Sequence, residues 1–339
     1  MIKDSTGGPK GMRRDGLLGL LLVVVLALVF HYWGDTRAED PLPEQQAAPA
    51  RQEVAPQNTP SREIPETGPA VRFLMQNVEN YFVEGERTRS RYVSKPKPVA
   101  ARDAVAKGIA DLAPDIIGLE EVGGEVSLND LRARLAKLGR EYPYHRVLER
   151  EGEERALAVL SRHPIVQDRS TADYPLYGEQ NRKMLRGILD VVVKAPDGRL
   201  FRIIGAHLKS HVADDAAAAD SLRQREAITL SMYLQKIARE QPGIPTLVYG
   251  DWNDGPGTPA IRQVEQGVSK DAAMHRLEPT DARGEGWTIY YKSGREYLTY
   301  DMIFVNKALQ SRMKRTEMGV APPTPKRASD HRAVWCELH

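Results

Sequence analysis

Cysteine is nearly absent from this sequence, because Cys336 is the only one among 339 residues. A single cysteine excludes an intramolecular disulfide and any zinc site built on several thiolates. Since Cys336 lies in the apolar run AVWCEL, we expect it to be a small buried residue. A lone thiol also suits an oxidising compartment, where it has no partner to mispair with.

The sequence also lacks a strong excess of positive or negative charge, and it has few aromatic residues. The formal net charge is +2 and aromatic residues make up 6% of the chain, so neither feature by itself argues for nucleic acid as a partner. Base stacking has support only from Tyr81, Tyr92 and Trp252. Two basic clusters could contact a nucleic-acid backbone or be ordinary solvated loops. They are Arg87, Arg89, Arg91, Lys95 and Lys97, and Arg312, Lys314, Arg315, Lys326 and Arg327.

The sequence has only one long apolar run without charged residues, at residues 17–30. Basic residues precede it, and His31, Tyr32 and Trp33 follow it. This order predicts that residues 1–34 form a membrane helix that anchors the protein, with a cleaved signal peptide and secretion as the alternative. Because basic flanks stay on the cytoplasmic side, the anchor would place the rest of the chain outside the cytoplasm, in the periplasm or beyond the cell.

Two regions follow the apolar run. Residues 35–69 contain seven prolines with Glu, Gln and Ala, a composition that cannot bury a core and predicts an extended, disordered tether. The folded domain is expected over residues 70–339. Many strands and few helices in one domain predict an α/β fold with two β-sheets packed face to face and helices outside. Strands are predicted at 71–77, 115–120, 156–161, 187–193, 201–207, 246–250, 300–305 and 333–338, and helices at 100–112, 128–138 and 220–239.

The stretch PTLVYGDWNDGPGTP, residues 245–259, places polar side chains where a predicted buried strand ends. Asp251, Asn253 and Asp254 follow the apolar part of this stretch. In an extended segment, Asp251 and Asn253 would point to the same side and face one ligand. The same residues are ordinary turn formers, so this stretch alone is compatible with either a turn or a site.

Other predicted strand ends carry similar side chains. Each has an ordinary structural explanation, such as a surface charge, a core histidine or a turn. Five strand ends with such side chains are harder to explain by structural roles alone, because α/β proteins often place catalytic and binding residues where strands end. Adjacent strand residues point to opposite faces, so only one of Glu120 and Glu121 can reach a given site. The other residues of this kind are Asn77, His207, Asp301, Asp330 and His331.

Seven sequence blocks, in order, resemble the endonuclease/exonuclease/phosphatase superfamily: FLMQNVENYF, DIIGLEEV, RALAVLSRHPI, GAHLKS, YGDWND, YDMIFVN and SDHRAV. The resemblance covers essentially residues 70–339. It implies a four-layer α/β sandwich, with two packed mixed β-sheets flanked by helices, which agrees with the strand and helix pattern. It also implies a metal-dependent phosphodiesterase, and the blocks are most similar in style to those of bacterial secreted or envelope nucleases.

The resemblance implies a metal site and phosphate contacts. Glu121 would hold a divalent metal, with Asp330 in support, and Asn77 would help to bind metal or phosphate. His207 would donate to a phosphate oxygen. Glu120 departs from the family pattern, where glutamine is usual, and would add a second negative charge beside Glu121.

The same resemblance implies the catalytic roles. Asp251 and Asn253 would contact the scissile phosphate and the nucleophilic water. Asp301 would orient His331. Glu154, through a weaker match, would orient the histidine that contacts the phosphate.

The chemistry of a phosphodiester explains why these residue types are needed. Hydrolysis requires charge neutralisation, a positioned water and a stabilised leaving oxygen. Mg²⁺, for which Mn²⁺ could substitute, prefers one or two carboxylates together with water and phosphate oxygens, which suits Glu121 and Asp330. A pair such as His331 and Asp301 supplies a base near neutral pH in a fixed tautomer. The sequence leaves open whether His331 or Asp251 accepts the proton of the attacking water.

The expected function is therefore a Mg²⁺-dependent phosphodiester hydrolase, a monomeric, membrane-tethered nuclease that acts on DNA or RNA outside the cytoplasm. One alternative is a lipid phosphodiesterase, or an inositol or other phosphatase, of the same superfamily. A membrane tether would suit a lipid headgroup, but the sequence has no long apolar loop for entering a bilayer. Another alternative is a non-catalytic binding module, which the intact set of Glu121, His207, Asp251, Asn253 and His331 argues against.

Overall fold

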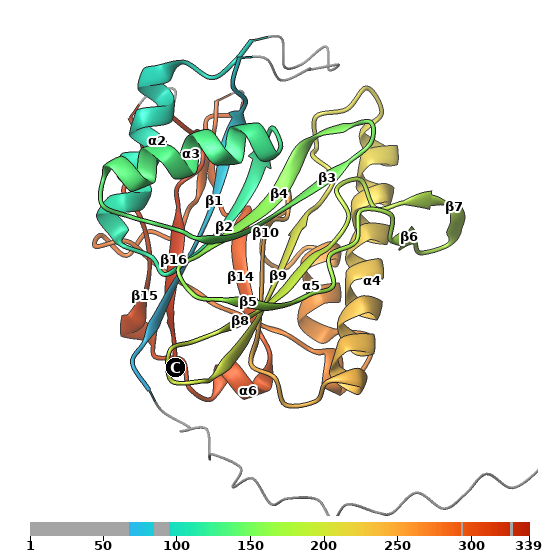
Figure 1. Cartoon of the computed structure of the whole chain (residues 1–339). Coiled ribbons are helices and arrows are strands. Elements are labelled where there is room, and N and C mark those ends of the chain that lie inside the picture. The colour runs from blue at the N-terminus through green and yellow to red at the C-terminus, as the bar shows by residue number, and fades with distance from the viewer. Residues whose placement is uncertain (1–67, 85–94, 293, 326–327) are drawn as a thin grey trace, which may run out of the picture. The chain divides into compact units, whose positions relative to one another are not determined.

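Figure 1 shows the computed structural model of the chain. The structure describes residues 68–84, 95–292, 294–325 and 328–339. These residues belong to one unit, which spans Arg62–His339. The predicted anchor at 1–34 and the predicted tether up to residue 67 lie outside the described residues. Among the helices that the structure describes, none combines the length and the apolar character needed to cross a membrane.

Two six-stranded mixed β-sheets form the centre of the domain. The order in the first sheet is β15 (Met318–Val320), β16 (Val334–Leu338), β1 (Val71–Tyr81), β2 (Ile116–Val122), β4 (Glu153–Ser161) and β3 (Tyr144–Arg150). The order in the second is β11 (His275–Arg276), β14 (Asp301–Val305), β10 (Thr246–Asp251), β9 (Leu200–His207), β8 (Leu189–Lys194) and β5 (Ile165–Asp168). In each sheet a central strand has one parallel and one antiparallel neighbour: β1 with β2 and β16, and β10 with β9 and β14.

Helices cover the outer face of each sheet, which gives the domain four layers (Figure 1). They are α2 (Val99–Leu112), α3 (Glu125–Lys137), α4 (Ala216–Glu240) and α5 (Pro259–Gln266), whereas Leu309 of the short α6 (Lys307–Gln310) packs into the core between the sheets. Ile109 of α2 and Leu131 of α3 belong to the apolar cluster on the outer face of the first sheet. Leu230 of α4 and Ile261 of α5 belong to the corresponding cluster on the second sheet. The predicted α/β sandwich of two packed mixed sheets flanked by helices is confirmed.

The alternation of side chains along each strand divides the core into an inner and two outer parts. Along β1, Phe73 and Met75 are buried between the two sheets, whereas Leu74 is buried beneath α2 and α3. Cys336 of β16 is fully buried in the inner part. The prediction that this lone cysteine is a small core residue is confirmed.

Tyr249 of β10 crosses the space between the two sheets. Its hydroxyl donates a hydrogen bond of 2.9 Å to the backbone oxygen of Ala158 on β4, in the other sheet. Gly118 of β2 and Gly205 of β9 leave room for this side chain, because a Cβ at either position would come within 2.6 Å of it. The tyrosine therefore ties the sheets together below their catalytic edge.

All the predicted strands and helices are present, with ends that differ by a few residues. The polar run after residue 75 concealed the true end of β1, which continues to Tyr81. The sequence did not predict several further elements, because most of them are too short to show a periodic apolar pattern. These include β3, β5, β11, β15, α5 and two hairpins, β6 (Pro175–Leu176) with β7 (Glu179–Lys183) and β12 (Ile289–Tyr291) with β13 (Glu296–Leu298).

Candidate active site

Three residues that lie opposite one another form a row across the second sheet, at one end of its central strands. Asp251 is the last residue of β10, and it lies opposite His207 of β9 and Asp301 of β14. On the first sheet, Asn77 of β1 lies opposite Glu120 of β2. The two sheets meet here, since Asn77 Nδ2 donates to Asp251 Oδ2 at 3.0 Å. Strand ends that are far apart in the sequence therefore come together at one edge of the sandwich.

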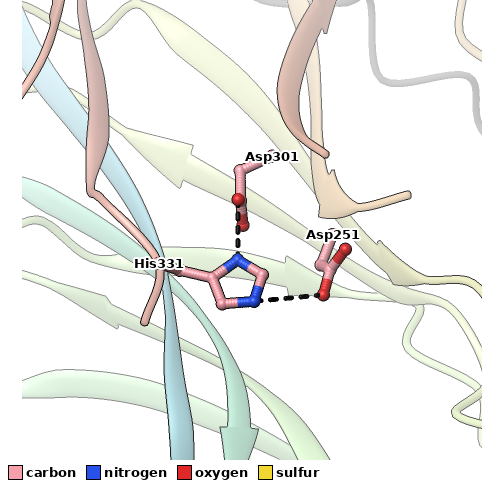
Figure 2. Close-up of side chains that lie close together, drawn as sticks. All are labelled: Asp251, Asp301 and His331. Carbon is pink, nitrogen blue, oxygen red and sulfur yellow. Dashed lines mark hydrogen bonds and ion pairs between the residues drawn. The ribbon is translucent and has the colours of Figure 1, made fainter. Parts of the chain in front are cut away.

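His331 lies just before β16 and faces two aspartates (Figure 2). Its Nδ1 lies 2.7 Å from Asp301 Oδ2, and its Nε2 lies 3.9 Å from Asp251 Oδ2. All three residues are buried. A histidine whose Nδ1–H donates to a carboxylate has a fixed ring orientation, with Nε2 directed at the reacting groups. The structure thus contains the pairing of Asp301 with His331 that the resemblance implied.

Two buried hydroxyl groups hold this pair in place. The Ser329 hydroxyl accepts the backbone N–H of His331 at 3.0 Å and donates to the backbone oxygen of Asn77 at 2.7 Å. The Thr288 hydroxyl accepts the backbone N–H of Asp301 at 3.0 Å. Neither Ser329 nor Thr288 was predicted as a site residue, because Thr288 lies in no recognisable motif and Ser329 resembles an ordinary turn residue.

The pKa values of His331 and Asp251 are shifted in ways that suit proton transfer. Burial alone would lower the pKa of His331, but the charge and hydrogen bond of Asp301, followed by the charge of Asp251, raise it well above 6.5. Burial raises the pKa of Asp251 to about 7, against the opposing charge of His331. Near neutral pH, His331 therefore favours its cationic form, while Asp251 is poised to exchange a proton.

Asn253 does not continue the strand as predicted. β10 ends at Asp251, and Asn253 has a φ of 50°, in the left-handed region. Its backbone N–H donates to Asp251 Oδ1 at 2.9 Å, and its side-chain Nδ2 donates to the backbone oxygen of Leu208 at 3.1 Å. The backbone is therefore not extended from Asp251 to Asn253 as predicted, because the chain turns between them. The turn instead fixes the Asp251 carboxylate.

His207 is buried beside Asp251, with its Nε2 3.5 Å from Asp251 Oδ2. Burial, followed by the charges of Arg186 and Arg155, holds its pKa well below 6.5, so the ring is neutral near neutral pH. Its Nδ1 has no hydrogen-bond partner among the described residues. The role of Glu154 in orienting His207, which the resemblance implied, stays a prediction.

Three carboxylates lie near one another, Glu79 in the last part of β1, Glu121 in the last part of β2 and Asp330 before β16. Glu121 accepts the backbone N–H of Asn80 at 3.0 Å and lies 3.4 Å from Arg155 Nε. Glu79 accepts the backbone N–H of Asp330 at 3.1 Å. Burial first, and then the negative charge of Asp330, raise the pKa of Glu79 against the opposing charge of Lys97, whose Nζ lies 4.0 Å from Glu79 Oε2, and Glu121 adds to the rise. A cation bound beside Glu79 would offset the charges of Asp330 and Glu121.

This donor set fits a hard divalent cation, because carboxylate oxygens are the ligands that such ions prefer. Glu121 and Asp330 approach from the strands on either side of β1, and Glu79 lies on β1 between them. Asn77 is less available than predicted, since its Oδ1 accepts the backbone N–H of Glu79 at 2.9 Å and its Nδ2 donates to Asp251.

A second set of donors is formed by Asp251, Asp301 and His331. One ligand atom from each lies within 4.8 Å of the others, so this group could also hold a metal ion. Two of its members are already joined by the 2.7 Å hydrogen bond between His331 and Asp301. That bond suits a proton-transfer group, whereas the cluster at Glu121 has carboxylates in excess.

Glu120 lies beneath the site and not at its rim. It is fully buried, and neither of its carboxyl oxygens has a hydrogen-bond partner among the described residues. Burial, followed by the charges of Asp301 and Asp251, raises its pKa well above 4.5. This environment favours the neutral form of Glu120 over the second negative charge that was expected beside Glu121. The sequence predicted that only one of Glu120 and Glu121 can reach a given site, and this arrangement agrees with that prediction.

Backbone strain is concentrated at the site. Six non-glycine residues of the described chain have positive φ, and four of them are Glu79 at 45°, Asn80 at 53°, Glu121 at 62° and Asn253 at 50°. Such conformations are uncommon for residues with a Cβ and persist where the surrounding structure holds them, often at functional sites. At Glu121, the strain coincides with a shift in the register between β2 and β4.

The aromatic residues singled out for base stacking are not accessible. Tyr81 is fully buried, and its hydroxyl donates to Asp130 Oδ2 at 2.7 Å. Trp252 is fully buried as well, and its Nε1 donates to the backbone oxygen of Met302 at 3.0 Å. Tyr81 and Trp252 therefore give no support for base stacking, because both rings belong to the core. Tyr92 lies outside the described residues.

In the structure, Lys97 and Lys314 of the two basic clusters make contacts within the protein. Lys97 is buried, and its Nζ donates to the backbone oxygen of Glu79 at 2.8 Å, so it supports the site from behind. Lys314 pairs with Glu317, which also bonds the last residue, His339, at the end of the first sheet opposite the site. This part of the second cluster cannot reach a substrate at the active site. Outside the described residues lie Arg87, Arg89, Arg91, Lys326 and Arg327.

The sandwich fold and the His–Asp pair beside a carboxylate cluster define a hydrolase that cleaves phosphate esters. The chain belongs to the Endonuclease/Exonuclease/phosphatase family, whose model matches residues 77–331. The matched region runs from Asn77 of β1 to His331 of the catalytic pair. The protein is thus a nuclease-like phosphodiesterase. No curated protein matches the sequence.

Solved structures of similar fold include the catalytic domain of human Nocturnin with bound sulfate, with a TM-score of 0.54, 18% identity, and coverage of 80% of this chain and 94% of that one. Beta toxin from Staphylococcus aureus has a TM-score of 0.57 and 17% identity, over 79% of this chain and 99% of the toxin. Sphingomyelinase C from Streptomyces griseocarneus has a TM-score of 0.53 and 16% identity, over 80% and 100%. At these identities the likeness concerns the fold.

Proposed function

We propose that this protein is a Mg²⁺-dependent phosphodiesterase that hydrolyses DNA or RNA. The observation that carries the proposal is the buried pair of His331 and Asp301, which faces Asp251 next to the carboxylates of Glu121 and Asp330. This arrangement supplies a proton acceptor, a cationic group and a cation-binding cluster within one site. Phosphodiester hydrolysis needs all three.

In the proposed mechanism, Asp251 accepts the proton of the attacking water, because its pKa of about 7 lets it do so near neutral pH. His331, held cationic by Asp301, stabilises the negative charge that develops on the phosphoryl group. His207 is neutral and donates an N–H to a phosphate oxygen. Glu121 and Asp330, with Glu79, would hold Mg²⁺, which would neutralise phosphate charge and support the leaving oxygen.

A lipid phosphodiesterase is the second candidate. It is supported by the fold likeness to sphingomyelinase C and by the predicted membrane anchor at residues 1–34. Nucleic acid remains the preferred substrate class, because the blocks around the site are similar in style to those of secreted nucleases. We further propose that the protein is a monomer that acts outside the cytoplasm, held by its anchor and the tether at 35–69.

The test is a substrate panel for the purified full chain. Single-stranded DNA, RNA, sphingomyelin vesicles and an inositol polyphosphate are each incubated with Mg²⁺, with Mn²⁺ or with excess EDTA. We expect hydrolysis of a nucleic acid that EDTA abolishes and that either ion restores. Full activity in EDTA would disprove the metal dependence, and turnover of sphingomyelin alone would replace the nuclease by the lipid enzyme.

A further inference from the structure

The β12–β13 hairpin is attached directly to the catalytic pair. Ile289 of β12 forms a backbone bridge with His331. The backbone N–H of Arg332 donates to the oxygen of Thr288 at 2.7 Å, and the Thr288 hydroxyl accepts the N–H of Asp301. The root of the hairpin therefore touches the residues on both sides of the hydrogen bond between His331 and Asp301, so its position relative to the site is fixed.

Aromatic residues are concentrated in this segment. They occupy five of the fourteen positions from 287 to 300, although they make up 6% of the whole chain. The Trp287 and Tyr297 rings have centroids 4.7 Å apart, and those of Tyr290 and Tyr297 are 4.9 Å apart. The guanidinium of Arg332, the residue after the catalytic histidine, lies 4.1 Å from the Trp287 ring centroid. We call Trp287, Tyr290 and Tyr297 the aromatic ladder.

The aromatic ladder is not part of the protein core. Tyr297, in contact with both other rings, is 63% exposed, and neighbouring Tyr291 is 43% exposed. Burial is the usual reason for rings to cluster in a folded protein, so an exposed cluster beside an active site needs another explanation. The rings offer an accessible aromatic face that is held by Arg332 at its inner end.

The side chains around the ladder favour a nucleic-acid strand over a bilayer. The large apolar residues that are exposed on this hairpin are Tyr291 and Tyr297. No aliphatic residue or phenylalanine is among the exposed large apolar residues of the described part of the hairpin. Lys292 and Arg295 are exposed on the same hairpin, together with one acidic residue, Glu296. Aromatic rings beside cations are the combination that holds single strands, because bases stack on the rings while the cations neutralise phosphates.

We propose that the aromatic ladder is a stacking platform for an unpaired base of the substrate, close to the scissile phosphate. This inference rests on the proposed function and narrows its substrate class to single-stranded nucleic acid or to the frayed ends of duplexes. Lys292 and Arg295 contact phosphates of the same strand. Tyr297 is the central residue, because it joins the other two rings and has the largest exposed surface of the three residues.

The experiment compares two oligonucleotides of equal length and charge, one with normal bases and one with abasic tetrahydrofuran residues throughout, in the presence of Mg²⁺. The full-length chain is assayed as wild type, Tyr297→Ala and Tyr297→Phe. Tyr144→Ala is the matched control, since Tyr144 is 40% exposed but starts β3 at the opposite end of the first sheet. Melting temperatures confirm that each variant folds.

We expect Tyr297→Ala to lower kcat/KM on the base-containing strand by about 5- to 150-fold, mainly through KM, since stacking on one ring is typically worth that much. On the abasic strand it should match wild type. Tyr297→Phe should keep the stacking and the rate, and Tyr144→Ala should leave both substrates unchanged. A purely structural role for Tyr297 would instead affect both strands equally and would lower the melting temperature.

The possible failures are distinguishable. If wild type cleaves both strands equally well, or if Tyr297→Ala loses the same factor on both, the platform is disproved and the nuclease proposal stands. If wild type cleaves neither strand but hydrolyses sphingomyelin vesicles, the nuclease proposal fails and the platform fails with it. If Tyr297→Ala selectively weakens binding to sphingomyelin vesicles, the ladder is a membrane contact and the base-stacking inference is overturned.

Discussion

Protonation is what distinguishes the acidic residues of this site from one another. Asp301 is paired with His331, burial raises the pKa of Asp251 to about 7, and burial raises the pKa of Glu120 well above 4.5. The three side chains have the same functional group, so their different roles come from burial and from their charged neighbours. Two predictions follow from this difference at the scale of single residues.

His331→Ala should lower kcat by at least about 10²-fold, because stabilisation of developing negative charge by a positioned group is typically worth about 10²–10³ in kcat. Asp301→Asn should cost less, since the ring remains but loses its charged partner. The measurement is kcat together with the melting temperature of the same samples. A His331→Ala protein that melts much earlier but turns over at the normal rate per folded molecule would show that His331 is only structural.

Glu120→Gln should stabilise the protein, and more so as the pH rises. Folding raises the pKa of Glu120 above its ordinary value of 4.5. Its favourable contribution is thus complete below pH 4.5 and is lost as the pH rises toward the folded-state pKa, by about 1.4 kcal/mol per pH unit. Glutamine has the same shape and does not titrate.

The measurement for Glu120→Gln is the difference in melting temperature between variant and wild type at pH 5 and at pH 8. We expect the difference to be small at pH 5 and clearly larger at pH 8. Glu337→Gln is a control, because Glu337 lies on β16 and pairs with Arg72 away from the buried acids. A difference for Glu120→Gln that does not change with pH would show that Glu120 is not protonated in the folded state.

At the scale of elements, a buried ion pair joins β8, β9 and α4. Asp190 and Arg202 are fully buried, with Asp190 Oδ1 3.0 Å from Arg202 Nε. The Tyr233 hydroxyl of α4 donates to Asp190 Oδ2 at 2.6 Å. The network therefore attaches the longest helix to the second sheet, and it supports the strand that ends in His207.

Asp190→Ala should destabilise the fold by about 3–5 kcal/mol, because it leaves the Arg202 guanidinium buried without its counter-ion. Urea unfolding provides the measurement, and kcat per folded molecule should stay near that of wild type. Lys107→Ala removes an exposed ion pair with Asp111 and should change stability by no more than about 1 kcal/mol. Equal losses in the two variants would mean that the Asp190 pair is not specially important.

At the scale of the whole molecule, the site exists because two sheets pack with their functional edges together. Asn77 comes from the first sheet, Asp251 from the second, and a hydrogen bond of 3.0 Å joins them. The site is thus complete only when both sheets are folded and packed. Loss of packing between the sheets would separate the catalytic residues even if each sheet stayed intact.

The predicted anchor is tested at the same scale. We expect the full chain to be found in the membrane fraction, and a chain shortened to Arg62–His339 to be found in the soluble fraction with equal activity on a nucleic acid. The physical reason is that residues 17–30 are uncharged and apolar, whereas the catalytic unit starts well beyond them. Recovery of the full chain in the cytosol would contradict both the anchor and the extracytoplasmic placement.

The sequence by itself determined the strands, the sandwich architecture and the types of residue at the site. Apolar runs and their periodicity are local properties, so they predicted β10 and the polar residue Asp251 at its end without any tertiary information. The ordered blocks likewise pointed to Asp301 and His331 as a pair. These features depend on side-chain type and on short-range spacing, which the sequence carries directly.

The tertiary structure alone decided which groups meet and which are charged. Thr288 and Ser329 support the catalytic pair through contacts with segments far away in the chain, and no local pattern marks them. Tyr81 and Trp252 turned out to be core residues, while Tyr297 gained an exposed position beside the site. Burial and the sum of neighbouring charges depend on how the sheets pack, so spacing along the chain could not predict them.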